Sequence, residues 1–184
     1  ITYKKPKTPS LVYLKECQAN YVYASLTTNR AKIQCSIVLC EILNKCINEP
    51  NSLLYTFIAD GFKYLDETDS IPIVFNSFFL IQFCKIMGIQ PLDDGVKNKR
   101  EMLLNMTDGC YVEQAEHSNK IIFAPKEESF EIYTLSRLDF SDLAHYAPSC
   151  QPNVCVFNYL VTYISIHLAD LTKLNSIKIL KELI

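Results

Sequence analysis

The feature that most constrains the fold is one long apolar segment, IPIVFNSFFLIQFCKIMG, at residues 71–88. It is apolar on nearly every side, which a helix tolerates only when neighbouring elements surround it. Gln82 and Lys85 interrupt it before it reaches the roughly 18 consecutive apolar residues that a membrane helix needs. The segment therefore predicts the central helix of a buried core, ended by Gly88 in a left-handed conformation and by Pro91.

Two amphipathic helices are predicted before this segment, because the apolar residues recur every three or four positions. The first is capped by Thr27, Thr28 or Asn29 and stops at Pro50. Its apolar face is expected to consist of Ile33, Ile37, Cys40, Leu43 and Ile47, with Lys32, Glu41 and Lys45 facing solvent. The second presents the stripe Leu54, Phe57, Ile58, Gly61, Phe62 and Leu65.

The second half of the chain mixes a small hairpin with further helices. Asp108 and Gly109 separate two short semi-apolar runs, which is typical of a tight β-hairpin, and KIIFAP at 120–125 is a candidate to join it. A weak helical pattern covers Phe130–Leu138, and SDLAHYAPS at 141–149 resembles a capped turn. A long helix is predicted from near Pro152, with Phe157, Leu160, Val161, Ile164, Leu168 and Leu171 on one face. The last is NSIKILKELI, a short amphipathic helix capped by Asn175 or Ser176.

Residues 1–23 differ from the rest, because they are rich in Thr, Val and Tyr and predict two strands around Pro6 and Pro9. Two strands alone cannot bury enough apolar surface to be stable, so we expect them to pair with a sheet that lies elsewhere or is missing. The chain begins at Ile1, without a methionine and without the order of a secretory signal. We therefore expect a fragment that is not exported and folds as a mainly α, α+β protein.

The eight cysteines favour a reduced, cytoplasmic protein. Those expected to pack as small apolar residues in helices are Cys35, Cys40, Cys46, Cys84 and Cys155. No pair has CxxC spacing, and no histidine is near enough in sequence to complete an obvious ligand set with Cys150 and Cys155, so we expect neither a structural zinc ion nor another cofactor.

Nothing in the sequence indicates an enzyme. The four glycines begin no phosphate-binding loop, and neither a GxSxG elbow nor an HExxH helix is present. His167 lies among apolar residues, where a histidine bonded to a nearby carbonyl is expected, and His117 is expected to be solvated. A small hydrolase that uses His145 and Asp142 remains open, and a deep polar pocket at those side chains would favour it.

One basic cluster stands out in a chain whose formal net charge is −2 and whose pI is about 5.9, so that any nucleic-acid contact must be local. The first fifteen residues contain no acid and carry Lys4, Lys5, Lys7 and Lys15. Tyr3 and Tyr13 lie among them and could stack on bases, as in single-strand binders. The alternative is a lysine-protected edge hairpin, which composition alone favours. Arg30 and Lys32 would extend the cluster.

The order of these segments resembles the RecO family over essentially the whole chain. The resemblance runs through LVYLKECQ, NRAKIQCSIVLCEILNKCI, NSLLYTFIADGFKYLDE, FNSFFLIQFCKIMGIQP, the Asp-Gly hairpin and NSIKILKELI. Its most telling features are Glu41 inside an apolar helix face, a helix ending in MGIQP and a closing helix of KxLKEL type. No single motif is as specific as a nucleotide-binding loop.

The resemblance implies an oligonucleotide-binding barrel followed by a helical domain, in a non-enzymatic mediator of recombinational repair. Residues 1–25 would be the last strands of a truncated barrel, and residues 26–184 the helical domain. Such a protein binds single- and double-stranded DNA, anneals complementary strands and works with RecR to load the recombinase. The implied DNA contacts are Lys4, Lys5, Lys7, Lys15, Arg30 and Lys32.

Two further expectations concern a partner and a metal. The family's helical domain is implied to bind the tail of single-stranded-DNA-binding protein in a basic and apolar groove, for which Phe75, Phe78, Lys63 and Lys85 are the candidates. The start of the central helix lacks the arginines of some relatives. Many members bind zinc through two cysteine pairs after the central helix, whereas this region keeps only Cys110, which indicates a zinc-free branch. The competing hypothesis is a helical protein-interaction module with no nucleic-acid role.

Overall fold

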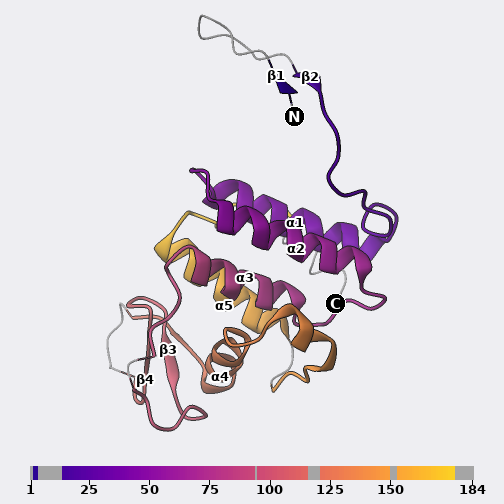
Figure 1. Cartoon of the computed structure of the whole chain (residues 1–184). Coiled ribbons are helices and arrows are strands. Elements are labelled where there is room, and N and C mark those ends of the chain that lie inside the picture. Colours follow the sequence, from indigo (N-terminus) through magenta and orange to yellow (C-terminus); the bar gives the residue numbers. More distant parts are fainter. Residues whose placement is uncertain (1, 4–13, 94, 116–120, 150–152, 177–184) are drawn as a thin grey trace, which may run out of the picture.

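The computed structural model describes residues 2–3, 14–93, 95–115, 121–149 and 153–176. The helices are α1 (Arg30–Cys46), α2 (Ser52–Glu67), α3 (Phe75–Ile86), α4 (Lys126–Leu135), α5 (Asn153–His167) and a 3-10 helix, η1 (Phe140–His145). The strands are β1 (Thr2–Tyr3), β2 (Leu14–Glu16), β3 (Leu103–Asn105), β4 (Cys110–Val112) and β5 (Phe123–Ala124). Figure 1 shows α1 and α2 as one layer over α3 and α5, with α4 and the β3–β4 hairpin on the far side. The expectation of a mainly α chain with a small antiparallel sheet is confirmed.

Helix α3 is the centre of the core, as its apolar sequence predicts. It packs against α2, α4 and α5, and its side chains from Phe78 to Ile81 are all buried. The chain leaves the helix through Gly88, whose φ of 74° lies in the left-handed region that glycine occupies without a steric cost. Among the described residues, no helix combines the length and the apolar character that crossing a membrane requires.

A glycine sets the distance between α2 and α3. A Cβ atom added at Gly61 would lie 2.6 Å from a ring carbon of Phe79 and 3.3 Å from one of Phe140. Phe79 is fully buried and also packs on Phe57, with ring centroids 4.7 Å apart, so the ring has little room to move. The apolar stripe predicted for α2 is therefore confirmed, and Gly61 is the position where the two helices approach closely.

The face predicted for α1 is only partly right. Asn29 is the cap, with its side chain accepting hydrogen bonds from Ala31 and Lys32 N–H, and Leu43 is buried as expected. Ile37, however, is 45% exposed and Cys40 is exposed, whereas Lys32 is buried. The buried face of α1 consists of Lys32, Val38, Leu39, Ile42, Leu43 and Cys46.

The predicted hairpin is confirmed, and the third extended piece joins it. Strands β3 and β4 pair antiparallel with Asn105 opposite Cys110, and Gly109 has a φ of 69° in the turn. Strand β5 pairs with β3 on its other side, which gives the order β4-β3-β5. The capped turn is present as η1, whose N-terminus is capped by Asp139 and Asp142 in a capping box. Of the closing helix predicted at 175–184, residues 177–184 lie outside the described residues.

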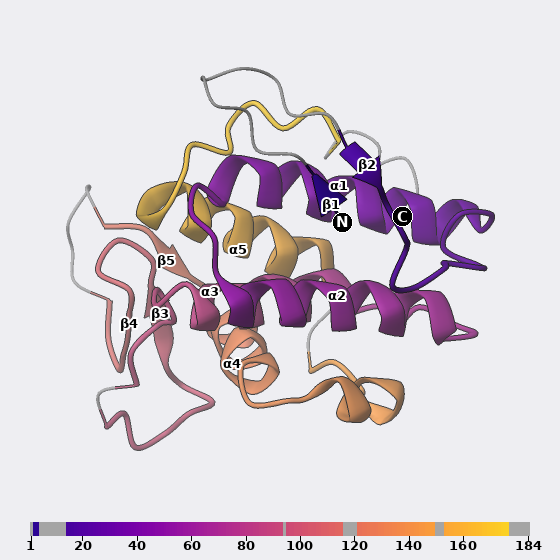
Figure 2. The ribbon, with the colours of Figure 1, turned by 45° about the horizontal axis from the view of Figure 1, so that its top comes forward.

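Strands β1 and β2 lie at the end of an extended segment that rises from the helical layers (Figure 1). They pair antiparallel with each other, with Thr2 opposite Glu16. Figure 2 shows the extended segment, in indigo, descending from β2 to the start of α1. The two strands are therefore confirmed, and their membership of a barrel stays a prediction.

Candidate nucleic-acid interface

The structure describes three of the six residues predicted to contact DNA: Lys15, Arg30 and Lys32. Lys15 on β2 and Arg30 at the start of α1 are exposed, so both can reach a phosphate group. Lys4, Lys5 and Lys7 lie outside the described residues. Lys15 is therefore the one lysine of residues 1–23 that the described part of the chain includes.

Lys32 has a structural role instead. Its side chain is 3% exposed, and its ammonium group donates to the Ser25 hydroxyl at 2.6 Å. It also donates to the carbonyl oxygens of Asp66 at 2.8 Å and Thr68 at 2.6 Å. An ammonium has three protons to donate, and all three have acceptors here. Lys32 therefore satisfies carbonyl groups at the end of α2, where a positive charge also complements the helix dipole, and it is not available to a phosphate in this conformation.

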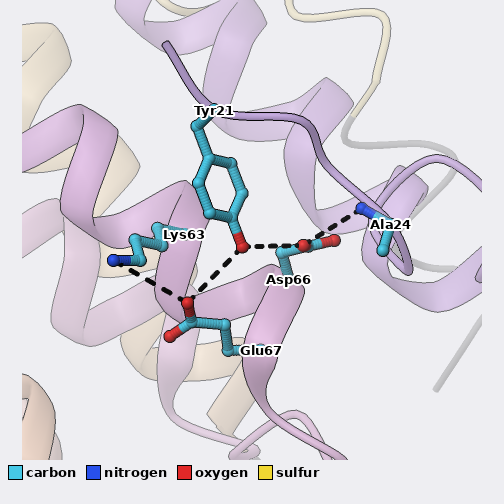
Figure 3. A network of polar contacts seen from close by, with 5 residues as sticks. All are labelled: Tyr21, Ala24, Lys63, Asp66 and Glu67. Carbon is cyan, nitrogen blue, oxygen red and sulfur yellow. Dashed lines mark hydrogen bonds and ion pairs between the residues drawn. The ribbon is translucent and has the colours of Figure 1, made fainter.

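The carboxylate of Asp66 fastens the segment before α1 to the end of α2 (Figure 3). It accepts hydrogen bonds from the backbone N–H of Leu26 at 2.6 Å and of Ala24 at 3.1 Å, and from the hydroxyl of Tyr21 at 3.0 Å. These donors, the Leu26 N–H first, stabilise the charged form and lower the pKa of Asp66 to about 2. Desolvation and the hydrogen bond to Asp66 raise the pKa of Tyr21 to about 12.

A groove of about 380 Å³ opens beside this network, between residues 18–23 and one face of α2. We call it the junction groove. Tyr21 and Tyr23 meet edge to face in its wall, with ring centroids 5.0 Å apart. Tyr55 contributes a third ring and is 67% exposed. The remaining lining comes from Gln18, Ala19, Asn20, Ala59, Asp60 and Lys63.

The structure shows a basic and aromatic surface that was not predicted from the sequence. The guanidinium of Arg137 lies 4.5 Å from the ring centroid of Tyr133, and the ammonium of Lys99 lies 5.3 Å from the same centroid. Asp93 pairs with both cations, and Arg100 lies 5.7 Å from the ring centroid of Phe130. We call these residues, with Lys97 and Lys126, the loop–α4 surface.

A pattern in the sequence could have found part of this surface. Lys126, Phe130, Tyr133 and Arg137 follow one another at three- and four-residue spacing, so they share a face of α4 and of the turn after it. The loop 95–101 supplies the remaining cations. That loop could not be placed against α4 from the sequence, since nothing local specifies its contact.

The four residues predicted to bind a protein tail do not form one site. Phe75 and Phe78 are each 1% exposed and pack on Tyr64 and Phe140, with centroid distances of 5.9 and 5.1 Å. Both rings therefore belong to the core. Lys63 lies in the junction groove and Lys85 is exposed at the end of α3, so the tail contact stays a prediction for these two lysines.

The histidines and cysteines follow their environments. Nε2 of His167 lies 2.8 Å from the carbonyl oxygen of Met106, which confirms the expected bond to a nearby carbonyl. His145 is exposed, and the carboxylate of Asp142 accepts the Asp139 N–H at 2.8 Å within the capping box. Asp142 thus caps the N-terminus of η1. Cys46 and Cys84 are buried as predicted, and burial raises the pKa of the Cys46 thiol to about 11.

Curated proteins similar to this chain carry the name DNA repair protein RecO. One from Phocaeicola vulgatus is 26% identical over 178 residues, which cover 95% of this chain and 71% of that protein. One from Azobacteroides pseudotrichonymphae is 23% identical over 171 residues, covering 91% and 69%. One from Christiangramia forsetii is 27% identical over 173 residues, covering 93% and 70%. No protein-family model matches the chain, and no solved structure matches it.

Proposed function

We propose that this chain, whose relatives support its assignment to the RecO family of DNA repair proteins, is a non-enzymatic DNA-binding mediator of recombinational repair. The observation that carries the proposal is the continuity of the similarity, which extends over more than nine-tenths of the chain in each of three relatives. In this proposal the protein anneals complementary strands and works with RecR to load the recombinase. Residues 1–25 belong to an oligonucleotide-binding module, and residues 26–184 form a helical domain.

Two surfaces are proposed to contact the DNA backbone. The first consists of Lys4, Lys5, Lys7, Lys15 and Arg30, without Lys32. The second is the loop–α4 surface, whose exposed cations Lys97, Arg100 and Arg137 can contact phosphates; Lys126 pairs with Glu101 there, and Arg137 pairs with Asp93. Because the formal net charge of the chain is −2, long-range attraction is weak and binding has to come from such local groups.

Strand annealing by the whole chain tests the proposal. We expect two complementary labelled oligonucleotides to anneal faster with the protein than without it, and the acceleration to fall steeply with salt, since phosphate contacts release counterions. Reversing charge at Lys4, Lys5 and Lys7 together is expected to remove most of the acceleration. The matched control reverses charge at Lys45, Lys173 and Lys181, which are assigned to neither surface and to no partner contact, and should keep the acceleration.

The competing function is a helical module that binds proteins and never touches nucleic acid. A helical body packed around the buried α3 is compatible with a protein-binding module and with a repair protein alike. If annealing is the same in the protein with reversed charges at Lys4, Lys5 and Lys7 as in the control, the interaction module is the better account.

In the repair proposal, Lys63 and Lys85 contact the tail of single-stranded-DNA-binding protein.

A further inference from the structure

The junction groove combines three aromatic rings with a negative electrostatic environment. Asp60 lies in its lining and is exposed. Among the described lining residues the one cation is Lys63, whose ammonium group lies 3.8 Å from a carboxylate oxygen of Glu67. Asp66 adds a further carboxylate immediately behind Tyr21 (Figure 3). Asp60, Asp66 and Glu67 stand against two ammonium groups, that of Lys63 and that of Lys32, which donates to the Asp66 carbonyl at 2.8 Å, so the net charge beside the groove is −1. This charge favours a cation over a phosphate.

The rings of the groove are suited to a cation. The face of an aromatic ring carries partial negative charge and attracts an ammonium or a guanidinium group. The chain already shows this contact, because Nζ of Lys63 lies 5.7 Å from the ring centroid of Tyr21. Tyr55 leaves two-thirds of its surface uncovered and offers the same type of face without a cation of its own among the described contacts.

One face of α2 forms a wall of the junction groove. Tyr55, Ala59 and Lys63 are four residues apart and so lie on one helix face. Ala59, between the two long side chains, leaves space that a flat group can enter. Asp60 adjoins this space as one of the lining residues, which places a carboxylate beside the tyrosine rings.

We propose that the junction groove binds an arginine side chain presented by a basic segment of a partner protein. The guanidinium group would stack on the ring of Tyr55 and pair with the carboxylate of Asp60. Arginine fits better than lysine because its planar group can stack on a ring and donate to a carboxylate in the same plane. This inference concerns a protein partner and does not depend on DNA binding by the chain.

Calorimetric titration of the whole chain with an acetylated and amidated tetra-arginine peptide tests the inference. Tyr55→Ala and Asp60→Asn are each expected to raise the dissociation constant about two- to fivefold, the range for exposed cation–π contacts and surface ion pairs. Asp69→Asn is the matched control, because it removes the same charge from an exposed residue just beyond α2 and outside the groove lining. The control is expected to bind as the unchanged chain does. Circular dichroism verifies that each variant is folded.

Two results would overturn the inference. If Asp69→Asn weakens the peptide as much as Asp60→Asn does, the peptide senses only the net charge of the surface. The other result concerns single-stranded DNA, tested with oligothymidylate. If Tyr55→Ala weakens the oligonucleotide while Asp60→Asn tightens it, and neither changes peptide binding, the groove stacks bases and does not hold arginine.

Discussion

Replacing Lys32 with methionine tests whether this buried lysine is a structural residue. Methionine has a similar length and fills the same space, but it donates no hydrogen bond. The substitution removes the Lys32 donor from the carbonyl oxygens of Asp66 and Thr68 and from the hydroxyl of Ser25. The Asp66 carbonyl keeps the Ser25 hydroxyl as a donor, whereas the Thr68 carbonyl loses the donor that the structure gives it. Each buried acceptor left unpaired costs roughly 1 to 3 kcal/mol.

Two effects offset part of that cost. The ammonium no longer has to be desolvated, and the Ser25 hydroxyl still donates to the backbone carbonyl of Asp66. We therefore expect Lys32→Met to lower the free energy of unfolding by about 2 kcal/mol. With a urea dependence of roughly 1 to 3 kcal/mol per molar, the midpoint of unfolding falls by about 1 M.

Urea unfolding followed by circular dichroism measures this change, and fluorescence anisotropy with a labelled oligonucleotide measures DNA affinity. The matched control is Lys173→Met, which removes the same charge at an exposed position and is expected to change stability by less than about 0.5 kcal/mol. Folded Lys32→Met protein should bind DNA as the Lys173 variant does. Unchanged stability together with a selective loss of DNA affinity would refute the structural role and return Lys32 to the DNA-binding set.

Three further predictions address packing, titration and thiol chemistry. Gly61→Ala is expected to destabilise the protein by about 1 to 3 kcal/mol in urea unfolding, although alanine favours a helix, because the added methyl group would overlap a buried phenylalanine ring. Asp66→Asn lowers the unfolding midpoint near neutral pH. Because the pKa of this carboxyl falls from 3.8 to about 2 on folding, the difference from the unchanged chain should shrink as the pH drops through that window, and a difference that persists at lower pH would contradict the mechanism. In native protein, Cys46 and Cys84 are expected to resist iodoacetamide while exposed Cys17 reacts, as mass spectrometry of the labelled peptides would report.

The parts of the fold that the sequence predicted are those specified by local patterns. The central helix α3 was predicted from an apolar run that is apolar on nearly every side, and Gly88 ends it as expected. The hairpin follows from Asp108 and Gly109, because glycine there accommodates a positive φ. In each case the residues that determine the structure are neighbours along the chain.

The parts that the sequence missed depend on contacts between distant residues. Helix α1 has two apolar stripes, and the choice of Val38 and Ile42 over Ile37 depends on which side faces α2 and α5. Lys32 was assigned to solvent because lysine is seldom buried, and its two carbonyl acceptors lie more than thirty residues away at the end of α2. Among the candidate partner residues, Phe75 and Phe78 were placed in a groove because a sequence does not distinguish an apolar groove from a core.

Two carboxylates hold segments from opposite ends of the described chain against the helices by one mechanism. Asp66 accepts the backbone N–H groups of Ala24 and Leu26, while Glu41 on α1 accepts those of Asn175 at 2.9 Å and Ser176 at 2.8 Å. Hydrogen bonds, first that of the Ser176 hydroxyl, lower the pKa of Glu41 as well, so both groups stay charged near neutral pH. A backbone N–H bound by a carboxylate does not depend on the identity of its own side chain. The segments they hold can therefore vary at Ala24, Leu26 and Asn175, which donate a backbone N–H. Tyr21 and Ser176 are constrained, because their hydroxyl groups also donate to these carboxylates, and the position of the segment carrying β2 relative to the helices depends on Asp66.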